Sequence, residues 1–140
     1  MSIYLYVIPG PAVPQGRPRL TTIGGHPRAY DPKKSRDYKT FVQHCVKEQG
    51  APEELLTGAL NVIITEFRAI PKSWSKRKHI AANMGDIRPT TKPDWDNIGK
   101  AVCDALNGLV WKDDSQIVHA TTEKYYSDDP RVVIGVSSDD

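Results

Sequence analysis

The sequence predicts a single α+β domain over residues 1–140, in which a mixed β-sheet is covered by helices mainly on one face. Stretches with the period of strands and of helices follow in the order strand, hairpin, helix, strand, helix, helix, strand, strand, which does not alternate regularly. A chain of 140 residues is long enough for one hydrophobic core. Its 39% hydrophobic and 26% charged residues are typical of a soluble globular protein.

The first thirty residues predict a strand, an extended loop and a hairpin. Apolar and aromatic side chains alternate over residues 3–8, as in a strand with both faces partly covered. Four prolines between Pro9 and Arg19 exclude a helix or a central strand there, so we expect a stiff extended loop. Residues 20–23 and 27–30 around Gly24-Gly25 favour a short hairpin.

Two helices are predicted in the middle of the chain. Asp31 can cap a helix that has Pro32 at its first position, and Gly50 is expected to end it. The first turns of this helix carry several basic residues. Cations at a helix N-terminus interact unfavourably with the helix dipole, and this small cost favours a functional basic patch. Residues 71–82 predict a short basic helix with Ser73 as its cap.

The remaining strands are predicted from alternation and from turn residues. Residues 59–69 alternate in the manner of a second clear strand. Residues 116–126 and 131–136 predict a terminal hairpin, because residues 127–130 form a polar turn that ends in proline.

One stretch carries acidic residues at both ends of a predicted helix. Asp94 and Asp96 open it, and Asp113 and Asp114 close it. The apolar residues between them recur at i, i+3, i+4, i+7, i+8 and i+11, which predicts an amphipathic helix. These residues are Ile98, Ala101, Val102, Ala105, Leu106 and Leu109. Asn107-Gly108 can supply the left-handed residue that ends the helix.

The acidic residues allow two interpretations. Asp94 and Asp96 could cap the helix, with Asp96 in a surface ion pair with Lys100 one turn later. They could instead bind Mg²⁺, which takes oxygen ligands, usually one or two carboxylates plus waters and substrate phosphates. A metal site that includes Asp114 requires the chain after Trp111 to fold back by roughly 20 Å, the length of the helix at 1.5 Å per residue.

Other sites fit the sequence less well. An EF-hand loop is excluded because Ile98 would take its fifth ligand position. The four histidines are scattered, and Cys45 and Cys103 lie in predicted helices where packing explains them. Free thiols, the lack of an apolar run of membrane length and the lack of a basic leader predict a cytoplasmic protein without a membrane partner.

Charge is distributed unevenly along the chain. Residues 1–50 carry eight Lys and Arg against three Asp and Glu, whereas residues 101–140 carry three against eight. This split is compatible with a basic surface beside an acidic one, and equally with two solvated faces that have no partner.

The acidic stretch resembles a known family signature. It contains Asp94-x-Asp96-Asn97-x-x-Lys100-x-x-x-Asp104-x-Leu106-Asn107-Gly108 and then Trp111-x-Asp113-Asp114-x-Gln116-Ile117, as in the RusA-type Holliday junction resolvases. The earlier segment Pro14-Gln-Gly-Arg17-Pro18-Arg19 is similar to the N-terminal loop of that family. Its members are small dimeric, Mg²⁺-dependent endodeoxyribonucleases of bacteria and their prophages. The three pieces occur in the right order.

The resemblance implies roles for named residues. Asp94, Asp96 and Asp114 would be the catalytic carboxylates that bind the metal, with Lys100 as the essential cation beside them. Asp113 could replace or assist Asp114 as a metal ligand. The implied cofactor is Mg²⁺, for which Mn²⁺ could substitute. Such a site can activate water and neutralise the attacked phosphate.

The resemblance also implies the partners. A homodimer would resolve a four-way DNA junction by two symmetric nicks, in recombination and repair. Basic residues outside the motif would contact DNA phosphates; the candidates are Arg17, Arg19, Lys33, Lys34, Lys72, Lys76, Arg77 and Lys78. Two rival hypotheses are a non-catalytic nucleic-acid-binding accessory module, which would bind without cleaving, and a Mg²⁺-dependent phosphatase, which would turn over small phosphate esters.

Overall fold

The computed structural model describes residues 1–139, with the side chains of Arg19 and Ile23 outside the described part. It confirms the predicted α+β class with a mixed sheet. In chain order its elements are β1 (Ser2–Pro9), β2 (Arg19–Ile23), β3 (His26–Tyr30), α1 (Lys33–Gln49), β4 (Leu60–Ala69), α2 (Lys76–Asn83), α3 (Trp95–Leu106), the 3-10 turn η1 (Asp114–Gln116), β5 (Ile117–Ser127) and β6 (Arg131–Ser138).

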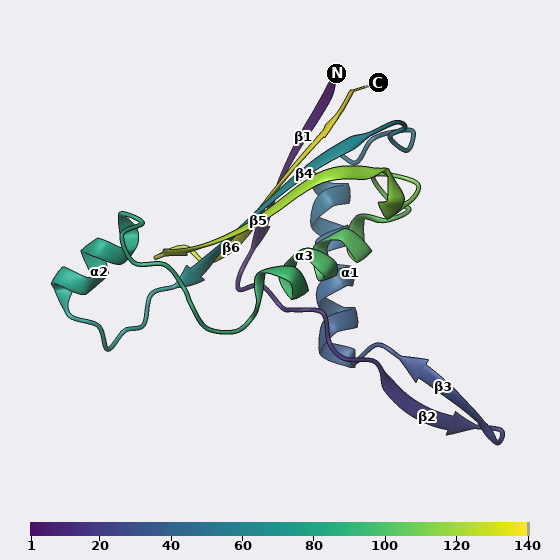
Figure 1. Cartoon of the computed structure of the whole chain (residues 1–140), viewed down its shortest axis with the longest axis horizontal. Coiled ribbons are helices and arrows are strands. Elements are labelled where there is room, and N and C mark those ends of the chain that lie inside the picture. Colours follow the sequence, from purple (N-terminus) through teal and green to yellow (C-terminus); the bar gives the residue numbers. More distant parts are fainter. Residues whose placement is uncertain (140) are drawn as a thin grey trace.

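Four strands form the main sheet, in the order β1-β6-β4-β5. Strand β6 is antiparallel to β1 and to β4, whereas β5 runs parallel to β4. Helices α1 and α3 lie together against one face of this sheet (Figure 1). Helix α2 lies beyond one end of the sheet, and the β2–β3 hairpin extends away from the body of the molecule at the other side.

The predicted terminal hairpin is wrong. Strands β5 and β6 are joined by a short turn, but β4 lies between them and hydrogen-bonds to both. Strand β4 is rich in Val and Ile, and a strand buried in this way is more stable at the centre of a sheet than at an edge. Short sequence separation of β5 and β6 therefore does not make them neighbours.

The hydrophobic core fills the space between the sheet and the two helices. Alternate residues of β4, beginning with Leu60 and Val62, point into it, as do Val42 of α1 and Val102 of α3. The largest fully buried side chain is Trp111, just beyond α3. All apolar positions predicted for the face of α3 are buried except Leu109, which lies past the end of the helix and is partly buried.

The opposite face of the sheet exposes apolar side chains. Ile3 is 72%, Leu5 67%, Val7 40% and Ile63 51% exposed. We call these four residues the open face. An apolar patch of this kind on a protein surface often marks an interaction site.

The helix ends confirm some predictions and correct others. Gly50 ends α1 with a φ of 112°. Asp31 does not cap that helix: α1 starts after Pro32 without a side-chain cap, because the Asp31 carboxylate accepts hydrogen bonds from other side chains instead. Helix α2 starts later than predicted, and its cap is Ser75 rather than Ser73, since the Ser75 hydroxyl accepts the backbone N–H of Lys78.

Helix α3 ends as predicted, because Gly108 follows it with a φ of 82°. Within residues 1–139, none of the helices combines the length and the apolar character needed to cross a membrane.

Candidate active site

One face of α3 lines a cavity of about 260 Å³ between this helix and strand β5. The helix contributes residues at i, i+3, i+4, i+7 and i+8, which lie on one face of a helix. They are Asp96, Gly99, Lys100, Cys103 and Asp104. Trp95 and Asp114 complete the rim, and Ile64, Ala120 and Thr122 form the wall on the sheet side. We call this the α3–β5 cavity.

The acidic residues at the start of α3 neither cap the helix with their side chains nor form the ion pair considered from the sequence. Asp94 occupies the N-cap position, but its side chain makes no capping hydrogen bond. Asp96 forms no ion pair with Lys100 among the described residues, although the two lie one turn apart. Helix capping and surface ion pairing therefore do not account for Asp94, Asp96 and Lys100.

A glycine sets the distance between α3 and the sheet. A Cβ atom added at Gly99 would lie 2.9 Å from the Thr122 hydroxyl oxygen and 4.0 Å from Cδ1 of Ile64. Any larger residue at this position would push the helix away from β5 or force Thr122 to rotate. Gly99 thus keeps the wall of the cavity close to Asp96 and Lys100 on the same helix.

A tight turn after α3 brings Asp114 back to the helix. The backbone N–H of Gly108 donates to the carbonyl of Trp111 at 2.7 Å, and Leu56 donates its N–H to the carbonyl of Val110 at 2.9 Å. The chain therefore folds back only part of the way that the prediction required. Asp114 shares the α3–β5 cavity with Asp96 and lies beside the second half of α3, whereas the prediction placed it at the start of the helix.

Trp111 holds the Asp114 carboxylate in the cavity. Its indole N–H donates to Asp114 Oδ1 at 2.7 Å, and its ring is fully buried. The neighbouring Asp113 has a different role: its carboxylate caps η1 by accepting the N–H of Ser115, while the Gln116 side chain accepts the N–H of Asp113. Asp113 lines another depression of the surface, so the structure brings Asp114 and not Asp113 into the cavity.

The electrostatics of the cavity favour a cation. Burial raises the pKa of Asp114, the negative charges of Asp104 and Asp113 raise it further, and the Trp111 hydrogen bond partly opposes these effects. Burial, with smaller contributions from Asp114 and Asp104, also raises the pKa of the Cys103 thiol to about 12, so this thiol is protonated at neutral pH. Carboxylates held together in a partly buried space repel one another, and a bound cation relieves that repulsion.

An arginine clamp fixes the chain that leads into α3. The Arg68 guanidinium makes two hydrogen bonds of 2.9 Å with the buried Glu66 carboxylate. It also donates to the carbonyls of Thr91, Lys92 and Pro93 at 3.0, 3.1 and 3.2 Å. The clamp therefore ties the backbone just before Asp94 to β4, one of the two interior strands of the sheet.

The donor set of the cavity suits Mg²⁺ or Mn²⁺. Asp96, Asp104 and Asp114 offer hard oxygen ligands, and the described residues include no group of three Asp, Glu, His or Cys side chains already close enough to hold one ion. Mg²⁺ does not require such a group, since it is usually held by one or two carboxylates with waters and substrate phosphates as the other ligands.

Comparison with known proteins decides the family. The sequence model of the endodeoxyribonuclease RusA family matches residues 9–137, which is nearly the whole chain. The chain belongs to the RusA endodeoxyribonuclease family. It is also 43% identical over 136 residues to the uncharacterized protein YqaN of Bacillus subtilis (strain 168), and the match covers 96% of this chain and 95% of the relative. Family membership confirms the resemblance inferred from the motif and implies endodeoxyribonuclease activity.

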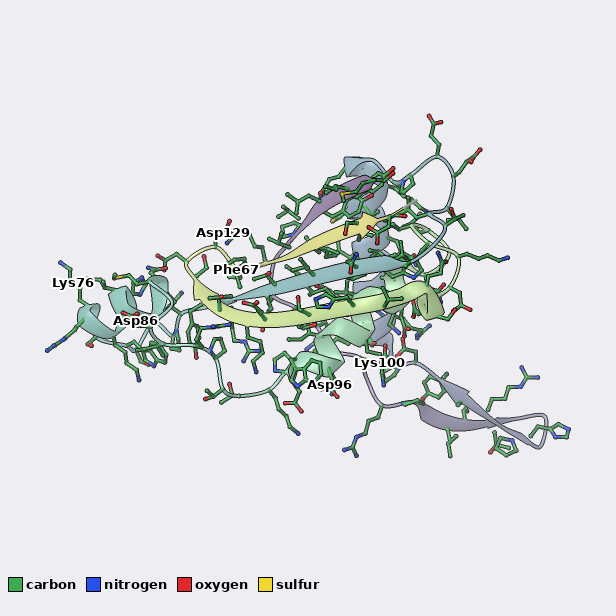
Figure 2. All side chains as sticks on the ribbon, turned by 45° about the horizontal axis from the view of Figure 1, so that its top comes forward. Phe67, Lys76, Asp86, Asp96, Lys100 and Asp129 are labelled. Carbon is green, nitrogen blue, oxygen red and sulfur yellow. The ribbon has the colours of Figure 1, made fainter. Side chains whose placement is uncertain are left out.

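The basic residues of this RusA-family protein lie in two regions on either side of the cavity. Arg17, Lys33 and Lys34 lie near the β2–β3 hairpin, whereas Lys72 precedes α2 and residues 76–78 begin it. The eighth candidate, Arg19, has its side chain outside the described residues. Figure 2 shows Asp96 and Lys100 on α3, between α2 with Lys76 at one end and the hairpin at the other.

Three contributors to the site were missed by the sequence interpretation. Asp104 lies on the same helical face as Asp96 and Lys100, and its spacing of eight and four residues from them was a usable signal. Trp111 donates its hydrogen bond to Asp114 only three residues later, within the motif, but the motif does not show that contact. Arg68 acts through contacts with residues far along the chain, which no local pattern indicates.

Proposed function

We propose that this protein is a Mg²⁺-dependent endonuclease that resolves four-way DNA junctions by paired symmetric nicks. The observation that carries the proposal is the α3–β5 cavity, where Asp96, Asp114 and Lys100 meet in a member of the RusA family. A junction has near two-fold symmetry, and two matched nicks are what separate it into two duplexes. This activity would serve DNA recombination and repair.

The proposed chemistry assigns parts to charged residues of the cavity and to Asp94 and Asp113, which do not line it. Asp96 and Asp114 would hold the metal, with Asp94 at the start of α3 as a further ligand once DNA is bound, and Asp113 would keep its role as the cap of η1. When bound, Mg²⁺ or Mn²⁺ supplies Lewis acidity toward the phosphate and lowers the pKa of water. Lys100 is exposed on the same face and stabilises negative charge as it develops on the attacked phosphate.

The proposed DNA path follows the basic residues. No Asp or Glu occurs in the first thirty residues, and the β2–β3 hairpin carries Arg28 and His26. The N-terminal turns of α2 carry Lys76, Arg77 and Lys78, all exposed. Phosphates of one duplex arm could contact the hairpin region while another arm contacts α2, which would leave the branch point over the cavity.

We also propose that the protein is a homodimer formed through the open face of the sheet. Two nicks at one junction require two cavities, and the open face exposes Ile3, Leu5 and Ile63 on the side of the sheet away from α3. Leu5→Glu should convert the dimer to a monomer in sedimentation analysis. Ile80→Glu, a similar change at an exposed position of α2, should leave the dimer intact. A wild-type monomer would contradict this proposal.

A cytoplasmic location is proposed as well, since the substrate is DNA and both cysteines are free thiols.

The test of the activity is cleavage of a labelled synthetic four-way junction. Asp96→Asn should reduce the cleavage rate by at least about a hundredfold, because metal charge stabilisation is worth several kcal/mol. Junction binding should persist in this variant. Asp86→Asn, an exposed acid outside the cavity, is the matched control and should cleave normally. Full activity of Asp96→Asn would overturn the assignment, and wild-type binding without cleavage under any divalent metal would favour a non-catalytic module.

A further inference from the structure

A second polar cavity, of about 330 Å³, shares a wall with the α3–β5 cavity. Lys100 and Asp104 line both cavities. The other lining residues come from the loop before β2 and from the first turn of α3, and they are Gln15, Gly16, Arg17, Pro18 and Asn97. We call this the Arg17 cavity. Its size is within the range of sites that bind small molecules, about 300–1,000 Å³.

The loop that forms the Arg17 cavity is fixed on several sides. The backbone N–H of Gln15 donates to the carbonyl of Asn97 at 3.0 Å, and its side-chain amide donates to Asp31 at 3.1 Å. The N–H of Gly16 donates to the Ser35 hydroxyl at 3.3 Å. A Cβ atom at Gly16 would lie 2.8 Å from Cγ of Pro32, so the loop packs closely against the start of α1. The cavity is therefore formed before any ligand binds.

The charge of the Arg17 cavity favours an anion. Arg17 and Lys100 contribute two cations, and Asp104 contributes the one carboxylate of the lining. That carboxylate is compensated, because the Lys39 ammonium lies 3.2 Å from it and 2.8 Å from Asp31. Burial lowers the pKa of Lys39, but the hydrogen bonds that its ammonium donates to these two carboxylates outweigh burial and raise the pKa, so Lys39 stays charged. The net charge around the cavity is positive.

One polar atom of the loop at this cavity lacks a hydrogen-bond partner, and the cavity brings together side chains that suit a phosphate. Gln15 Oε1 is buried without a hydrogen-bond partner among the described residues. A buried water molecule can supply the donor that such an acceptor needs. An arginine fork beside a lysine and an amide is a common phosphate-binding combination.

We propose that the Arg17 cavity binds the phosphodiester next to the one that is cleaved, with Arg17 and Asn97 as its ligands and Lys100 between the two phosphates. The proposal rests on the proposed function, since it takes the scissile phosphate to lie in the α3–β5 cavity. A DNA strand carries one phosphate per nucleotide, so a strand that places one phosphate in the first cavity presents its neighbour within reach of the second. Gln15, Asp31, Lys39 and Asp104 position the site without contacting the phosphate.

The test replaces single phosphates of the junction by neutral methylphosphonate linkages on either side of the cut site. Binding is measured without divalent metal and cleavage with Mg²⁺, for the wild type, Arg17→Gln and Asn97→Ala. For the wild type, one flanking position should lower affinity by roughly tenfold to a hundredfold, the value of a charge-assisted hydrogen bond. In Arg17→Gln the same neutral linkage should lower affinity by no more than about twofold, because the arginine that would contact this phosphate is already absent.

Controls separate the subsite from general charge effects and from the proposed activity. Lys47→Gln, at the exposed far end of α1, should respond to the neutral linkage as the wild type does. Equal losses in the wild type and in both variants, or no loss at any flanking position, would overturn the subsite. A wild type that does not cleave the unmodified junction would refute the proposed function, whereas the binding measurements would still decide on the subsite.

Discussion

Trp111 offers the sharpest test of how the fold supports the candidate active site. Trp111→Phe keeps a buried aromatic ring but removes the 2.7 Å hydrogen bond to Asp114. A hydrogen bond to a charged group contributes about 1.5–3 kcal/mol. Because Asp114 remains partly accessible to water, we use the lower end of that range. The smaller ring leaves a void worth about 1 kcal/mol, so we expect a loss near 2.5 kcal/mol in the free energy of unfolding.

This loss should leave the protein folded, since domains of this size are stable by about 5–15 kcal/mol. The functional effect follows from the pKa of Asp114, which the Trp111 hydrogen bond lowers. Without that bond the pKa rises further, and metal binding needs the deprotonated carboxylate. The acid limb of the pH–rate profile for junction cleavage should therefore move to higher pH, and the Mg²⁺ concentration for half-maximal rate should rise about tenfold to a hundredfold.

Urea unfolding and cleavage assays at varied Mg²⁺ concentration and pH would check both effects. Trp74→Phe is the matched control, because Trp74 is partly exposed and packs edge-on against Tyr126 outside the cavity. It should cost less than about 1 kcal/mol and leave the Mg²⁺ requirement unchanged. If Trp111→Phe lost stability but kept the wild-type Mg²⁺ and pH dependence, Trp111 would be a core residue only, and the argument that it positions Asp114 would fail.

Two further predictions concern α3 and Asp114. Gly99→Ala should lower the free energy of unfolding, measured in urea, by up to about 2 kcal/mol, because the clash with Thr122 outweighs the gain in helix propensity of about 1 kcal/mol. In a Thr122→Ala background the same change should stabilise the protein. Equal effects in both backgrounds would contradict this account. Asp114→Asn should abolish cleavage. It should also stabilise the metal-free protein at pH 7 by about 0.5–1 kcal/mol, because it removes a partly buried negative charge that lies beside other carboxylates. A carboxyl whose folded pKa is raised stabilises the fold only while protonated, and this contribution is lost as pH rises through that pKa. The gain should therefore shrink as the pH falls below that pKa, and a variant less stable than the wild type at pH 7 would refute it.

Local patterns predicted most elements of this fold. Period-two alternation predicted β1 and β4, and the apolar stripe predicted the buried face of α3. Gly50 and Gly108 have positive φ at the ends of their helices, as expected from their positions. These features depend on residues close in sequence, where side-chain period and backbone freedom decide the conformation.

Strand pairing could not be predicted in the same way. The turn between β5 and β6 has the length and composition of a hairpin loop, yet both strands pair with β4. The choice depends on which strand buries the most apolar surface at the centre of the sheet, and that is a property of the whole chain. The same applies to Arg68, whose hydrogen bonds join β4 to the segment just before α3, which only the folded protein brings together.

Different contacts hold each of the three carboxylates of the candidate site in place. Asp96 is fixed by the helix and Asp104 by Lys39, whereas Asp114 is fixed by Trp111 and by the capped turn η1. No support is shared by all three, so the fold keeps Asp114 at the cavity although the charges of Asp104 and Asp113 raise its pKa. This repulsion costs stability in the metal-free protein, and a bound cation offsets it. We therefore expect any metal to bind to carboxylates that the fold, rather than the ion, holds in place.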